Sequence, residues 1–303
     1  MTDPIQTDSK ARPQTSPRRI MLTILITPVV FYLAFCLFVF LYQSHLLYYP
    51  QKGLDLTPQD AGMEYEEIIL ESGDEKTPIV AWYVPAREDR GTALFCHGNA
   101  GNLSGRLDII EQYRDLGLNV LILDYRGYGR SKGRPSEEGT YEDGLAAWRY
   151  LTETRGCSPN EIVILGRSLG GAIAAWLAQR HTPGALILES AFTSVPDIGA
   201  EVYPYLPVRL LSRFRYNSLA RMSEIRCPVL IAHGRDDEMI PFDHGRALFE
   251  AAREPKAFLE MTGTHNEGFA MTRARYAQEI DSFLKKRFDR PFTAGSPAPT
   301  PDP

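Results

Sequence analysis

The sequence predicts an α/β fold with a mostly parallel central sheet and helices on both faces. The first observation is a series of short, continuous apolar runs, which are typical of strands buried on both sides. These runs cover residues 92–96, 120–123, 162–165, 185–188 and 228–232. The second is that helical patterns separate most of them, at about residues 105–116, 139–155, 169–180, 242–252 and 267–287. Because parallel strands end at one edge of the sheet, ligand-binding residues are expected there.

The first element along the chain is an apolar segment, residues 20–42, that contains no charged residue. As a helix it would span about 35 Å, which exceeds the bilayer's apolar core of about 30 Å. A cleaved signal peptide would have a shorter apolar core and a small-residue cleavage site, whereas this segment has bulky residues throughout. We therefore expect a transmembrane anchor.

The charges around this segment predict its orientation. Four cations precede it, Lys10, Arg12, Arg18 and Arg19, and the first cation after it is Lys52. The positive-inside tendency then makes residues 1–19 a disordered cytoplasmic N-terminus and places the rest of the chain on the opposite side. In a bacterium, that side is the periplasmic face of the inner membrane.

Residues 60–288 are expected to form a single folded domain, since 303 residues with 44% hydrophobic content supply a full core. Runs at 65–70 and 79–84 alternate loosely and predict an antiparallel hairpin at the sheet edge. The connection 192–226 is too long for a simple loop. It is either a small cap over the functional site or the approach to a crossover helix. Residues 289–303 are rich in proline and predict a disordered tail.

Composition narrows the class of partner. A formal net charge of −5, with no basic stripe that carries interleaved aromatic residues, argues against nucleic acid. The four cysteines, Cys36, Cys96, Cys157 and Cys227, are scattered over an apolar segment, core strands and a loop, so we expect no structural disulfide.

The strongest local signal is Gly166-Arg167-Ser168-Leu169-Gly170-Gly171, a G-x-S-x-G pattern between a strand-like run and an alanine-rich helical stretch. A strand that turns directly into a helix strains its pivot residue and exposes that side chain above the sheet. Ser168 is therefore the candidate nucleophile. The glycines beside it are expected where backbone segments crowd together.

A nucleophilic serine needs a base, and the base needs a carboxylate to orient it. His265 follows the last strand-like run, 256–261, and comes last in chain order, as this arrangement requires. The acid is expected after the run 228–232. We choose Asp237, with Asp236 as its main rival. Glu189 could serve in a variant arrangement, although a structural role fits its strand-end position better.

The fourth part is an oxyanion hole. Residues 92–96 lead into His97-Gly98-Asn99-Ala100-Gly101, whose small residues let backbone N–H groups point into a cavity. In this arrangement one donor follows the nucleophile and another comes from such a loop. We assign the backbone amides of Leu169 and Asn99.

Taken together, the motifs resemble the membrane-anchored α/β-hydrolases that include eukaryotic protein depalmitoylases and their bacterial relatives. The motifs concerned are 166–171, 97–101, Asp124-Tyr125-Arg126-Gly127-Tyr128-Gly129-Arg130-Ser131, 203–211, 237–238 and Gly263-Thr264-His265-Asn266. This resemblance implies the α/β-hydrolase fold, the triad Ser168, Asp237 and His265, and activity on acyl esters or thioesters. Unlike those depalmitoylases, which lipidated cysteine-rich N-termini hold to membranes, this chain has an apolar helix, so their substrates do not carry over.

The sequence therefore predicts a membrane-anchored serine hydrolase that works through an acyl-enzyme, without a metal or other cofactor. Its substrate is expected to be a small-molecule or lipid-like acyl compound, and its oligomeric state is left open. Two alternatives stand beside this prediction. One is a serine peptidase with the same triad, and the other is a membrane-anchored scaffold whose triad is idle.

Overall fold

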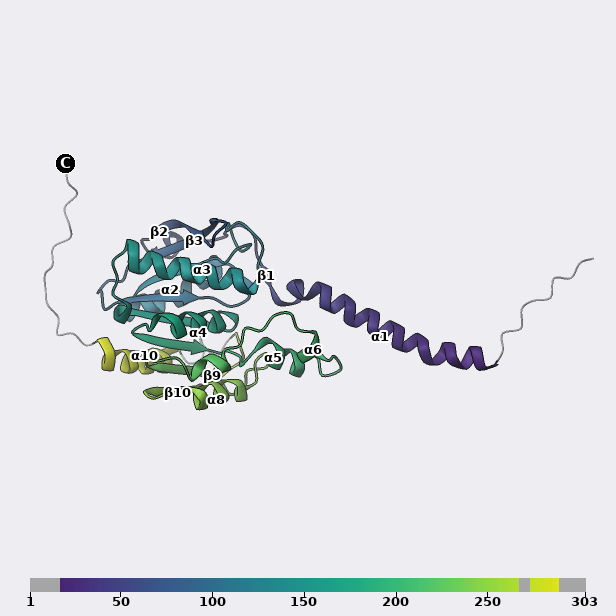
Figure 1. Cartoon of the computed structure of the whole chain (residues 1–303). Coiled ribbons are helices and arrows are strands. Elements are labelled where there is room, and N and C mark those ends of the chain that lie inside the picture. The colour runs from purple at the N-terminus through teal and green to yellow at the C-terminus, as the bar shows by residue number, and fades with distance from the viewer. Residues whose placement is uncertain (1–16, 267–272, 289–303) are drawn as a thin grey trace, which may run out of the picture. The chain divides into compact units, whose positions relative to one another are not determined.

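The computed structural model describes residues 17–266 and 273–288 (Figure 1). The chain divides into two compact units, residues 1–43 and 44–303. Helix α1 covers Pro17–Leu47 and so includes the predicted apolar segment. In the described part of the chain it is the one helix that is long and apolar enough to cross a membrane, with a hydropathy of 2.7. These properties fit both a membrane anchor and a signal sequence.

The structure covers only part of the segments predicted at the two ends of the chain, residues 1–19 and 289–303. Residues 17–19 belong to α1, so the helix begins before the predicted start at residue 20. The remainder of the expected N-terminal tail and the whole expected C-terminal tail, 289–303, lie outside the described residues.

Unit 44–303 is built on an eight-stranded sheet, as the sequence predicts. Its order from edge to edge is β10-β9-β8-β7-β4-β6-β3-β2. The strand bounds are β2 Glu66–Ser72, β3 Thr77–Val84, β4 Thr92–Cys96, β6 Asn119–Leu123, β7 Ile162–Arg167, β8 Ala185–Glu189, β9 Val229–Gly234 and β10 Lys256–Met261. In this order, the neighbouring strands from β10 to β6, which include β4, pair in parallel, whereas β3 runs antiparallel to both β6 and β2. The edge hairpin is thus confirmed.

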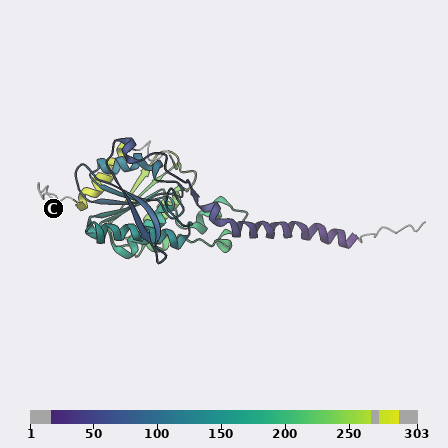
Figure 2. The ribbon, with the colours of Figure 1, turned by 90° about the horizontal axis from the view of Figure 1, so that it is seen from above.

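Helices cover both faces of this sheet, which explains why the central strands are apolar on both sides. Each strand sends alternate side chains to opposite faces. Phe95 of β4 belongs to the same buried cluster as residues of α2 (Leu107–Asp115) and α10 (Arg273–Phe288). Leu94 belongs to the cluster on the other face, with residues of α3 (Glu137–Arg149), α4 (Leu169–His181) and α8 (Phe242–Ala251). Figure 2 shows the yellow α10 on one side of the twisted sheet and the teal α3 and α4 on the other. The mostly parallel α/β architecture is confirmed.

The sequence gives no hint of a second, two-stranded sheet. Strand β1 (Tyr49–Pro50) pairs in parallel with β5 (Ala100–Gly101), and the Tyr49 amide donates to the Asn99 carbonyl over 3.0 Å. The Asn99 side-chain amide in turn donates to the Leu47 carbonyl over 2.9 Å. The segment that follows α1 is therefore hydrogen-bonded to the loop after β4.

The long connection 192–226 holds three short helices, α5 (Val195–Val202), α6 (Val208–Leu211) and α7 (Leu219–Met222), rather than one crossover helix. Buried Tyr216 fixes it to the domain, because its hydroxyl lies 2.7 Å from the hydroxyls of both Tyr48 and Thr140. Glu137, at the start of α3, accepts the amides of Arg215 and Tyr216. The segment is thus held at the N-terminal end of α3.

Candidate active site

Ser168 occupies the sharp turn between β7 and α4. Its backbone has φ of 52° and ψ of −120°, a conformation that L-residues with side chains rarely adopt. The Ser168 amide donates to the Glu189 carbonyl of β8, and the Ser168 carbonyl accepts from Gly171, both over 2.9 Å. The neighbouring strand and the first turn of α4 therefore maintain the strain that such a turn stores.

The flanking glycines are needed for packing, as their spacing predicts. A Cβ at Gly170 would lie 2.0 Å from the Cys96 carbonyl oxygen at the end of β4. A Cβ at Gly166 would lie 2.5 Å from the Gly170 carbonyl oxygen. Any side chain at either position would therefore push α4 away from the strands that position Ser168.

Asp237 and His265 come together from the loops after β9 and β10. Asp237 Oδ2 accepts a hydrogen bond from His265 Nδ1 over 2.8 Å. Its other oxygen, Oδ1, accepts the amides of Met239 and Ile240 over 3.0 Å and 2.8 Å. Burial alone would raise the pKa of Asp237, but the hydrogen bond and charge of His265, followed by the Ile240 amide, lower it overall. Asp237 is thus held as a carboxylate.

The competing carboxylates have other environments. Asp236 is exposed to solvent, whereas Asp237 is only 7% exposed. Glu189 is buried at the end of β8, where it accepts a hydrogen bond from the Tyr113 hydroxyl over 3.0 Å. Burial raises the pKa of Glu189 to about 7, against the lowering effect of Arg167. Only Asp237 among these three bonds to His265.

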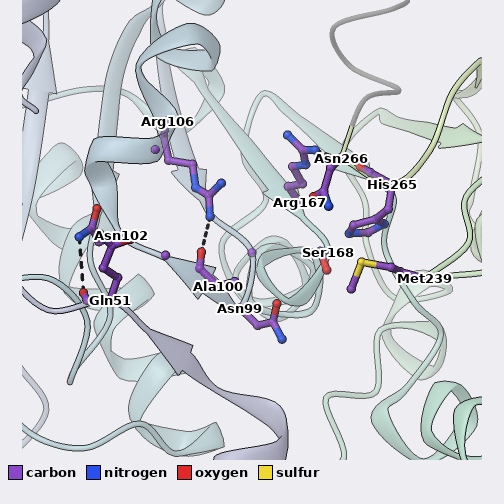
Figure 3. Close-up of a pocket in the computed structure, with 13 residues that line it drawn as sticks. Gln51, Asn99, Ala100, Asn102, Arg106, Arg167, Ser168, Met239, His265 and Asn266 are labelled. Atoms are coloured by element: carbon purple, nitrogen blue, oxygen red, sulfur yellow. Dashed lines mark hydrogen bonds between the residues drawn. The ribbon is translucent and has the colours of Figure 1, made fainter. Parts of the chain in front are cut away.

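Ser168 and His265 line the same cavity, which has a volume of about 280 Å³. Figure 3 shows the Ser168 hydroxyl and the His265 ring side by side at one end of it. Across the described residues, Ser168 Oγ makes no hydrogen bond. Nucleophile–base contacts are often long in enzymes without substrate and shorten on binding.

The residues assigned to the oxyanion hole lie beside Ser168. Leu169 is the first residue of α4, so its amide has no partner within the helix. The loop after β4 approaches the serine closely, since a Cβ at Gly98 would be 3.5 Å from Ser168 Cβ. Asn99 lines the cavity, and its carbonyl is held by the Tyr49 amide and the Tyr128 hydroxyl. This loop is therefore braced from the side opposite the cavity.

Sequence reasoning missed most of the other cavity residues. Gln51, Asn102, Arg106, Met239 and Asn266 line the cavity, and Arg167 joins them from the variable position before Ser168. Two of them had a sequence signal, Arg167 in the G-x-S-x-G pattern and Asn266 in the motif Gly263-Thr264-His265-Asn266. No residue of the connection 192–226 lines this cavity.

No group of three histidine, cysteine, aspartate or glutamate side chains in the described ranges could hold a metal ion. His97 and His233, the two histidines that follow the apolar runs of β4 and β9, are both fully buried. His233 Nε2 donates to the Ile240 carbonyl over 2.8 Å, which ties the Asp237 loop to β9. All four cysteines are free.

The fold and the arrangement of the loops match known proteins. Residues 93–211 match the family model described as the alpha/beta hydrolase fold. The Schizosaccharomyces pombe protein bem46 is 39% identical over 67% of this chain and 73% of its own length. The Arabidopsis thaliana alpha/beta hydrolase domain-containing protein WAV2 is 35% identical over 81% of this chain and 88% of its own. The chain belongs to the α/β-hydrolase family.

Solved structures share the same α/β-hydrolase fold. The Pyrococcus furiosus esterase Pf2001 superposes with a TM-score of 0.67 at 19% identity, over 79% of this chain and 99% of that one. At this identity the likeness concerns the fold alone.

Proposed function

We propose that this protein is a serine hydrolase that cleaves carboxylic esters or thioesters through an acyl-enzyme intermediate. The observation that carries the proposal is the 2.8 Å hydrogen bond between Asp237 and His265, whose ring faces the cavity that Ser168 also lines. Nucleophile, base and orienting carboxylate arranged in this order are the requirements of acyl transfer.

In the proposed mechanism, His265 Nε2 accepts the Ser168 proton while Oγ attacks the substrate carbonyl. Asp237 keeps the Nδ1 proton of His265 in place and stabilises the imidazolium that forms. The amides of Leu169 and Asn99 donate to the oxyanion, and the loss of one such donor typically costs about 3 kcal/mol of transition-state stabilisation. His265 then protonates the leaving group. Water repeats the same steps to release the acid and restore Ser168.

We further propose that α1 anchors the enzyme in a membrane, with its N-terminus in the cytoplasm and unit 44–303 on the opposite side. The uncharged run 20–42 and the cations before it support this orientation. Fusing a phosphatase that works only outside the cytoplasm after residue 303 would test it. An active fusion is expected. Activity of a reporter that works only in the cytoplasm, fused at the same position, would contradict the orientation. Release of a shortened chain from the membrane would identify α1 as a signal sequence.

Labelling with a fluorophosphonate probe tests the nucleophile, because the probe reacts only with an activated serine. We expect labelling of the wild type and of Ser158→Ala, an exposed serine before β7, but not of Ser168→Ala. Equal labelling of wild type and Ser168→Ala would contradict the proposal. The absence of any labelling would favour an idle scaffold.

A substrate panel tests the reaction class. Purified enzyme is given p-nitrophenyl esters, acyl thioesters and aminoacyl amides of matched acyl groups, and kcat/KM is measured for each. Esters or thioesters are expected to react fastest. Faster turnover of the amides would indicate a peptidase instead.

A further inference from the structure

Two arginines, Arg106 and Arg167, line the cavity that holds Ser168 and His265. Arg106 lies just before α2 on the oxyanion-loop side, and Arg167 is the last residue of β7. Figure 3 shows both guanidinium groups beside the cavity, with Arg167 next to Asn266. Their positions alone place two positive charges within reach of one bound molecule.

In the described protein, neither arginine is held in a close ion pair, although the charges of Asp108 and Asp124 partly offset the burial that lowers the pKa of Arg106. In residues 17–266 and 273–288, no carboxylate forms an ion pair with either arginine, and no cavity-lining residue is acidic. Arg106 donates to the Ala100 carbonyl, and its buried Nε has no partner there. Arg167 donates once, to the His265 carbonyl over 3.1 Å. Most of their donors are therefore available to a ligand.

The surroundings of the cavity disfavour the cation of Arg106. Burial, and then the charge of Arg167, lower the pKa of Arg106. Arg167 also lowers the pKa of Glu189, which burial raises to about 7. An anion between the two arginines would relieve the repulsion between them. Planar guanidinium groups also match carboxylate and phosphate oxygens in bidentate geometry.

The remaining lining favours a short, polar ligand. Polar side chains make up most of the described lining, namely Gln51, Asn99, Asn102 and Asn266, and Met239 is the one large apolar side chain among the described lining residues. The side-chain amides of Gln51, Asn99 and Asn102 already donate to protein oxygens, which leaves the two arginines as the main donors for a ligand. At about 280 Å³, the cavity lies just below the usual range for ligand sites, about 300–1,000 Å³. A long fatty acyl chain would need a larger and more apolar pocket.

We propose that the natural substrate carries an anionic group, a carboxylate or a phosphate, close to its ester or thioester bond, and that Arg106 and Arg167 bind this group. This inference rests on the proposed hydrolytic function. It narrows the substrate class from acyl compounds in general to short, negatively charged ones.

The test compares pairs of substrates that differ mainly in charge. In the first pair the charge lies in the acyl group, because mono-p-nitrophenyl adipate carries a carboxylate that p-nitrophenyl hexanoate lacks. A second set of pairs places the charge in the leaving group. Here 3-acetoxybenzoate, which carries a carboxylate, and 3-acetoxyphenyl phosphate, which carries a phosphate, are each compared with neutral phenyl acetate. In at least one pair we expect kcat/KM of the anionic member to be about ten- to a hundredfold higher, mainly through a lower KM.

Three variants assign this preference to the arginines. Arg106→Gln and Arg167→Gln are each expected to reduce the anionic-to-neutral ratio of kcat/KM at least about tenfold. The matched control is Arg209→Gln on α6, which removes the same charge from an exposed site. It should leave the ratio unchanged. Because the readout is a ratio within each variant, a general loss of activity does not mimic the result.

A binding measurement covers the case in which a variant is too inactive to assay. Adipate and inorganic phosphate are titrated as inhibitors of neutral-ester hydrolysis by the wild type, with hexanamide as the uncharged control. The same compounds are tested as thermal stabilisers of each variant. We expect an anion to bind the wild type and Arg209→Gln, and to bind both cavity variants more weakly. Hydrolysis of neutral esters without any anionic preference would overturn this inference and leave the proposed function intact. Failure to hydrolyse any ester would overturn the function itself.

Discussion

Replacing Asp237 with asparagine would remove the charge behind His265 while preserving the shape of its loop. The asparagine Oδ1 can still accept the Met239 and Ile240 amides, so its NH₂ group faces His265 Nδ1. Two donors cannot share a hydrogen bond, and the ring would carry its proton on Nε2 instead. His265 would then be unable to take the Ser168 proton.

The size of the effect follows from the distance. The carboxylate and the imidazolium formed during reaction would be joined by the 2.8 Å contact between Asp237 Oδ2 and His265 Nδ1. With an effective dielectric constant of about 20, their attraction is about 6 kcal/mol. Since about 1.4 kcal/mol corresponds to a factor of ten, we expect kcat to fall by about 10⁴-fold.

The assay is p-nitrophenyl ester hydrolysis, with circular dichroism to verify folding. Asp236→Asn is the matched control, because Asp236 is the exposed neighbour with no contact to His265. Its kcat should remain within about twofold of the wild type, as is usual for surface changes. If Asp236→Asn were the inactive variant, or if folded Asp237→Asn kept more than a tenth of the activity, the assignment of the triad acid would be refuted.

Two further predictions concern stability. Gly170→Ala should lower the free energy of unfolding by at least about 3 kcal/mol, because its Cβ would lie 2.0 Å from the Cys96 carbonyl oxygen. Gly105→Ala, with nothing within 4 Å, is the control, and similar urea midpoints for the two would contradict the packing argument. The second prediction concerns Glu189, whose pKa is about 7 in the folded protein and 4.5 ordinarily. Folding therefore favours the protonated carboxyl group. The stability that this preference contributes is complete below pH 4.5 and is lost as the pH rises through 7. Glu189→Gln should therefore match the wild type near about pH 4 and exceed it by about 3 kcal/mol near about pH 8, and a difference independent of pH would refute this linkage.

The central sheet could be predicted because burial on both faces leaves a strong pattern. The runs 92–96 and 256–261 coincide with β4 and β10. Strand β9 extends beyond its apolar run to include His233 and Gly234, because Glu260 and Met261 of β10 pair with them. Pairing with a neighbouring strand is a tertiary effect, so a local pattern underestimates strand length.

The candidate triad was predictable because it combines a local motif with chain order. Ser168 had a motif, whereas Asp237 was chosen over Asp236 from room in the loop, and its role stays a prediction. The contribution of Arg106 to the cavity could not be predicted, because it depends on how α2 and the turn before it pack against β6. Likewise, strand β1 is too short to show periodicity and is defined by its partner, β5.

The pairing of β1 with β5 has a consequence for the proposed membrane anchor, because it would separate release of unit 44–303 from loss of the proposed activity. A protease that cuts α1 before Ser44 would leave unit 44–303 whole, including the strand that supports the Asn99 loop. A cut just after Gly53 would remove Tyr49 and Gln51 and would expose backbone groups of Asn99 and Gly101 that they now satisfy. A fragment cut at the first place would keep the geometry of the proposed oxyanion loop, and a slightly shorter fragment would lose its support.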